Sequence, residues 1–178
     1  MQNLTLTPVE ATSPLVRHWL AYLEDGRSRT ARVVKELSVA DLEARPAAVQ
    51  NSIGTLLAHV AAIEMDWLYS EILEREIPPE VLVLLPSDVC DEAVHLMDVR
   101  GLSAAEHLER LATTRRYFVQ HLSQMDQMEF LRVRELSEVS VTPEWVCCHL
   151  LQHEANHRSQ IVQITNALGN GSTLNCRK

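Results

Sequence analysis

The stretch Thr142–Gly169, TPEWVCCHLLQHEANHRSQIVQITNALG, decides the fold class. Thr142 can cap a helix, Pro143 suits the first helical position, where a backbone N–H is not needed, and Gly169 is a typical stop. Apolar side chains recur between these limits at helical spacing. They are Trp145, Val146, Leu150, Ile161, Ile164 and Leu168. The stretch therefore predicts one long helix over residues 143–168.

Three further stretches carry the same helical pattern. They cover residues 14–37, 52–76 and 103–125. Each is preceded or opened by residues that cap helices: Ser13 before Pro14, Ser52, and the capping-box sequence Ser103-Ala104-Ala105-Glu106. Four amphipathic helices of this length predict an all-α four-helix bundle that forms a single domain over residues 1–178. No stretch alternates strongly enough to predict a sheet.

The connection between the second and third predicted helices, Ile77–Gly101, is long for a compact bundle. We expect it either to hold a short helix near Asp91–Met97 or to cross over the bundle. Both alternatives leave the four long helices unchanged.

Composition limits the classes of function. The net charge of −8 argues against nucleic acid as a partner, because phosphate binding needs a basic face. The arginines at helical spacing, Arg27, Arg29, Arg32, Arg115 and Arg116, are interpreted as solvated helix faces. The N-terminus has no secretory pattern, no apolar run is long enough for a bilayer, and the four cysteines form no CxxC pair. We therefore expect a cytoplasmic protein with reduced thiols and no membrane partner.

Three histidines are the candidate metal ligands. His153 and His157 stand at i and i+4, so both project from one face of a helix at the spacing that holds one divalent ion. His59 lies in an almost wholly apolar window, where a buried imidazole needs a hydrogen-bond partner or a metal. The three together predict a site with an open coordination position. His149, one turn before His153, is left out of the ligand set because three such residues curve off one face.

The remaining histidines are interpreted as surface residues or as core residues with hydrogen-bond partners. They are His18, His95, His107 and His121.

Glu154 is the one catalytic candidate. His153-Glu154-x-x-His157 matches the zincin metalloprotease pattern, in which the glutamate is the general base, but the third ligand of the extended pattern and the substrate-binding sheet are both missing. Glu154 can still polarise a metal-bound water. The alternative, which we slightly favour, is an ordinary surface pair with Arg158 at i+4.

Two segments resemble the DinB/YfiT-like superfamily of metal enzymes. One is Ser52-Ile53-Gly54-Thr55-Leu56-Leu57-Ala58-His59, with Trp67 two turns on; the other is His153-Glu154-Ala155-Asn156-His157-Arg158-Ser159-Gln160-Ile161, followed by Leu168-Gly169. Ser159 stands where the family often has glycine. The resemblance implies an up-down-down-up bundle with a long connection after the second helix. It also implies a nickel or zinc site at His59, His153 and His157, and a homodimer.

Characterised relatives in this superfamily include S-transferases and isomerases that use mycothiol, bacillithiol or glutathione, and some hydrolases. The resemblance therefore implies a metal-dependent enzyme that acts on a small molecule, most directly a thiol S-transferase. Two alternatives remain: a non-catalytic stress-response or binding module with a structural metal, and a metal-free dimeric scaffold.

Overall fold

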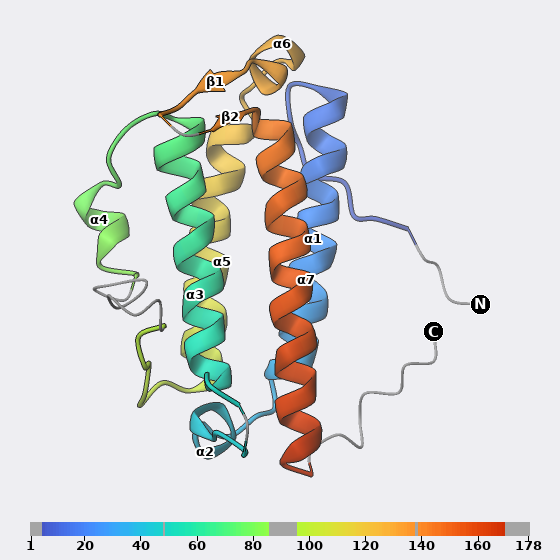
Figure 1. Cartoon of the computed structure of the whole chain (residues 1–178). Coiled ribbons are helices and arrows are strands. Elements are labelled where there is room, and N and C mark those ends of the chain that lie inside the picture. Colours follow the sequence, from blue (N-terminus) through green and yellow to red (C-terminus); the bar gives the residue numbers. More distant parts are fainter. Residues whose placement is uncertain (1–4, 48, 86–95, 138, 170–178) are drawn as a thin grey trace.

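The computed structural model describes residues 5–47, 49–85, 96–137 and 139–169, and four long helices dominate it (Figure 1). They are α1 (Pro14–Val34), α3 (Ile53–Asp66, continued by the π-helical segment η1, Trp67–Ile72), α5 (Ala104–Leu122) and α7 (Pro143–Ala167). Helix α1 packs against α7, α7 against α3, α3 against α5, and α5 against α1. Helices α1 and α7 run in one direction and α3 and α5 in the other. The prediction of an all-α chain is confirmed.

Most of the predicted caps form. The Ser52 side chain accepts from the backbone N–H of Thr55, and the Thr142 side chain accepts from that of Trp145. Ser103 and Glu106 make a complete capping box at the start of α5. These bonds satisfy backbone donors that have no partner within the helix. Ser13 differs, since it occupies the N-cap position of α1 but makes no side-chain cap bond to the described residues.

Short elements fill the connections. They are α2 (Val39–Glu43), α4 (Pro79–Leu82), α6 (Gln127–Leu131), β1 (Arg134–Glu135) and β2 (Ser140–Val141). The two strands pair antiparallel. The sequence did not predict them, because two residues are too few for an alternating pattern. The expected short helix at 91–97 lies largely outside the described residues, and Leu96 and Met97 are not helical.

Two hydrophobic clusters make up the core that positions α3 and α7. The first lies toward the end of the molecule that carries α6 and the strands and includes Leu20, Leu68, Phe118, Phe130 and Val146. The second lies toward α2 and includes Leu42, Ile53, Leu57, Leu111 and Ile161. No helix in the described part of the chain is long and apolar enough to cross a membrane.

Candidate metal centre

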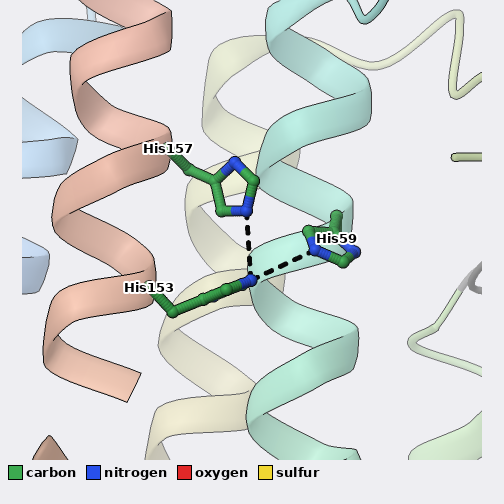
Figure 2. Close-up of side chains that lie close together, drawn as sticks. All are labelled: His59, His153 and His157. Carbon is green, nitrogen blue, oxygen red and sulfur yellow. Dashed lines mark hydrogen bonds between the residues drawn. The ribbon is translucent and has the colours of Figure 1, made fainter. Parts of the chain in front are cut away.

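Three histidine rings from two helices meet between α3 and α7 (Figure 2). His59 comes from α3, and His153 and His157 come from one face of α7. Nε2 of His153 lies 3.1 Å from Nε2 of His59 and 3.0 Å from Nε2 of His157. One potential ligand nitrogen from each ring lies within 4.8 Å of the other two. The structure thus brings together the three residues that the sequence proposed as ligands.

The surroundings keep these imidazoles neutral. Burial, with a smaller contribution from the nearby His157, lowers the pKa of His59 to about 4. Burial likewise lowers the pKa of His153 to about 3, with the neighbouring histidines adding to the effect. The pKa of His157 is also lowered by burial, although its hydrogen bond with Gln160 acts in the opposite direction. Neutral imidazole is the form that binds a metal.

The hydrogen-bond pattern leaves ring nitrogens that a cation would satisfy. A single proton on Nε2 of His153 can serve only one of the two ring nitrogens beside it. Nδ1 of His157 donates to Oε1 of Gln160 at 3.0 Å, which keeps the Nε2 lone pair directed at the cluster. Nδ1 of His59 is buried and has no hydrogen-bond partner among the described residues.

The donor set fits a divalent metal. Imidazole nitrogens bind zinc at ~2.0–2.1 Å, so two of them on one ion lie roughly 3 Å apart when the angle at the ion is near 90°. The two Nε2–Nε2 separations of 3.0 and 3.1 Å agree with this geometry. Three imidazoles suit nickel and zinc alike. The cluster can therefore hold a divalent ion, and its geometry does not distinguish between the two.

The surface role predicted for Glu154 is wrong. Glu154 is only 3% exposed, and its two carboxylate oxygens accept hydrogen bonds from Nε of Arg27 at 3.0 and 3.1 Å. Arg158 instead donates to the backbone carbonyl of Gly26 at 3.2 Å. Glu154 follows His153 by one residue, so its side chain leaves α7 about 100° away from the metal-ligand direction. A role for Glu154 as a catalytic base stays a prediction.

Glu154 belongs to a buried ion cluster formed by Arg27, Glu64, Arg115 and Glu154, one from each long helix. Arg115 bonds Glu64 at 2.6 Å and contacts Glu154 at 3.5 Å, and Arg27 bonds Glu64 at 3.2 Å. Burial by itself would raise the pKa of Glu154, but Arg27 and Arg115 outweigh it and lower that pKa. The cluster therefore holds two positive and two negative charges that balance inside the bundle.

Sequence reasoning missed this cluster because it read the arginines as solvated. Arg27 is 8% exposed and Arg115 is 4% exposed, whereas their neighbours Arg29 and Arg116 are on the surface. One signal was available in the sequence: Glu64 lies in the otherwise apolar segment 60–65. The close approach of Gly26, next to Arg27, to Leu151 of α7 is visible only in the structure.

The other histidines fall into different settings. His18 is exposed and His95 lies outside the described residues. His107 is buried, yet its Nδ1 has no hydrogen-bond partner in the described part of the chain, so it is not a core histidine with its bonds satisfied. His149 lies against Trp67 and Trp145 and is not among the three rings that converge.

A separate pocket of about 800 Å³ lies between α1 and α5. Arg27 and Arg115 line it together with Glu24 and Asp25, but none of the three clustered histidines is among its described lining residues. This pocket is thus distinct from the histidine cluster.

The fold and site define a helical protein with three clustered histidines that can hold a divalent metal. A family model described as the DinB superfamily matches residues 22–161, and the chain belongs to that superfamily. The matched range contains all three histidines.

A solved structure supports the fold. It is described as a conserved protein of locus from Enterococcus faecalis, and it superposes with a TM-score of 0.67 at 16% sequence identity. The match covers 90% of this chain and 99% of that one. At this identity the likeness concerns the fold alone. No curated protein matched the sequence.

Proposed function

We propose that this protein is a metal-dependent enzyme that binds nickel or zinc through His59, His153 and His157 and acts on a small molecule. The reaction that we favour is S-transfer from a low-molecular-weight thiol such as bacillithiol, mycothiol or glutathione. Hydrolysis and isomerisation, which other members of the superfamily catalyse, are the related possibilities. The observation that carries the proposal is the convergence of three neutral ring nitrogens, two pairs of them 3.0 and 3.1 Å apart.

The chain's own residues supply binding and orientation. Gln160 fixes the ring of His157, and packing between α3 and α7 sets the position of His59 relative to the other two rings. A bound divalent ion would supply the Lewis acidity that lowers the pKa of a thiol or a water. In the S-transfer reaction the thiol gives its proton to solvent water, its sulfur forms a bond to an electrophilic carbon, and the leaving group on that carbon departs with the electron pair of the broken bond.

The finer features expected from the superfamily belong to the same proposal. We take the helix arrangement to be the up-down-down-up bundle, which the helix directions in Figure 1 support. A homodimer is also proposed, on the superfamily resemblance, and a cytoplasmic location is proposed from the cysteine pattern of the sequence.

Metal content tests the proposal first. Mass spectrometry on untagged protein should find near-stoichiometric nickel or zinc in the wild type and its loss in His59→Ala and in His157→Ala. His149→Ala is the matched control, because it removes a histidine from the same helix that lies outside the converging set. A wild type that takes up neither metal, even after incubation, would remove the basis of the enzyme proposal and favour a metal-free scaffold.

Turnover is then measured with each thiol and a generic electrophile, and with metal-depleted protein as the blank. Metal binding without turnover of any thiol or ester would favour the non-catalytic module.

A further inference from the structure

An aromatic row, which we define as Trp67, Trp145 and His149, lies beside the three metal-site histidines. The rings of Trp145 and His149 are almost parallel, at 8°, with centroids 5.2 Å apart. Trp67 reaches both of them from η1, with its centroid 5.5 Å from Trp145 and 4.7 Å from His149. Residues 145 and 149 are one turn apart on α7, so the row lies along the helix that also carries His153 and His157.

The row continues into the metal site. The rings of His149 and His153 are stacked at 6.0 Å and 26°. Four residues of α7, Trp145, His149, His153 and His157, follow one another at intervals of four, from a tryptophan to two of the converging ring nitrogens. A molecule that reaches these nitrogens from the Trp145 end passes beside these rings.

Exposure and ring geometry make the row suited to a flat apolar group. Trp145 is 50% exposed, which is unusual for a tryptophan whose role is only to fill the core. The ring of His149 lies between those of Trp145 and His153 and adds a further flat surface to the row. Parallel rings favour an offset-stacked partner, and a planar aromatic group gains more from such a surface than a puckered one of equal size.

Trp67 also marks a change in the backbone. The α-helix turns into a π-helix at this residue, and Leu73 N–H bonds to the carbonyl of Leu68, five residues back. Such segments are rare and occur frequently at functional sites. The change of helix type thus falls on Trp67, the residue that η1 contributes to the row.

We propose that the aromatic row binds a planar aromatic ring of the substrate, beside the metal site. Within the proposed function, on which this inference rests, the aromatic ring belongs to the small-molecule electrophile. Its ring lies against the half-exposed indole of Trp145 while its reactive part reaches the histidine cluster.

The first test uses metal-free protein and the indole N–H signals of the three tryptophans in nitrogen-15 NMR spectra. Titration with benzamide should shift the signals of Trp67 and Trp145 in a saturable way, and cyclohexanecarboxamide should shift them little. Trp19 is the internal control, because its ring lies against Tyr22 and its indole N–H is bonded to Glu144. Equal effects of the two amides, or no saturable shift at Trp67 or Trp145, would overturn the proposal whether or not the protein binds metal.

The second test uses protein loaded with nickel or zinc and two hydroxamates that share a metal-binding head group. Calorimetry should show benzohydroxamate binding roughly 2- to 12-fold more tightly than cyclohexanecarbohydroxamate, the ratio expected for an aromatic contact beyond its buried area. The ratio should fall to about one in Trp145→Ala, return in Trp145→Phe and stay unchanged in Tyr22→Ala, which removes an aromatic of similar exposure. A ratio of one in the wild type, or one that Trp145→Ala leaves intact, would contradict the aromatic site alone; absence of metal uptake would contradict the proposed function alone.

Discussion

Replacing Glu154 by leucine should destabilise the metal-free protein strongly, because it leaves an uneven charge inside the bundle. The wild-type ion cluster pairs Arg27 and Arg115 with Glu64 and Glu154. Without Glu154, two guanidinium groups share one buried carboxylate and a partly exposed contact from Arg115 to Glu24 at 3.4 Å. A buried charge without its partner is among the few causes of large mutational effects.

The expected magnitude follows from distance and burial. Two unit charges 4 Å apart interact by about 4 kcal/mol at an effective dielectric constant of 20. The Glu154 oxygens lie 3.0 and 3.1 Å from Nε of Arg27, and both side chains are more than nine-tenths buried. Breaking such a pair costs about 3–5 kcal/mol, and we expect Glu154→Leu to fall in this range.

A double variant separates charge balance from packing. Arg27→Met with Glu154→Leu removes one charge of each sign and leaves the Arg115–Glu64 pair, 2.6 Å apart, with its charges balanced. We expect the double variant to lose at least about 2 kcal/mol less free energy of unfolding than the sum of the losses in the two single variants. The control is Asp25→Ala, which breaks an exposed pair with Arg29 and should cost less than about 1 kcal/mol.

Urea unfolding of metal-free protein, followed by circular dichroism at pH 7, measures all four variants. A Glu154→Leu variant within about 0.5 kcal/mol of the wild type, the range of ordinary surface substitutions, would refute the reasoning. So would strict additivity of the two single changes. Either result would mean that balancing the charge of Arg27 is not what makes Glu154 important for stability.

Three further predictions concern other parts of the chain. Burial lowers the pKa of His107 to about 4, so between this pKa and that of the unfolded chain only the unfolded chain binds a proton at this residue. The free energy of unfolding should therefore fall when metal-free protein is taken from pH 7 to pH 5. In urea unfolding, His107→Leu should reduce that fall by about 1–2 kcal/mol. Gly54→Ala should cost about 1–3 kcal/mol by thermal unfolding, since the new Cβ would lie 3.0 Å from Nε2 of His107; an unchanged melting temperature would contradict this. Gln160→Ala should weaken metal binding by about 10-fold or more in a competition titration with a chelator, because the ring of His157 loses its orienting partner, and unchanged affinity would show that this bond has no such role.

The ion cluster gives α7 a reason to keep one rotation about its axis. Glu154 points into the bundle toward Arg27. The preceding residue, His153, points about 100° away from it around the helix, toward His59. Turning α7 to bring Glu154 to the surface would bury the histidine face elsewhere and separate the three rings. The buried charges and the metal site therefore depend on the same orientation of one helix.

Local signals in the sequence were sufficient for the long helices. Ser52, Ser103 and Thr142 bond backbone N–H groups three residues ahead, and such bonds depend only on the immediate neighbours. The pairing of His153 with His157 is local in the same sense. The two-residue strands at 134–135 and 140–141 were missed, because pairing this short leaves no periodic trace.

The sequence by itself determined the helical class, the helix limits within a few residues and the i, i+4 histidine pair, because each of these follows from interactions within one or two turns of the chain. Only the tertiary structure decided which arginines are buried, that Glu154 faces inward, and that Trp67 meets His149 of another helix. These facts depend on the rotation of each helix about its own axis, which is set by packing between residues far apart in the sequence. The helical periodicity of the sequence predicts which residues share a face, but packing against the neighbouring helices determines what that face contacts.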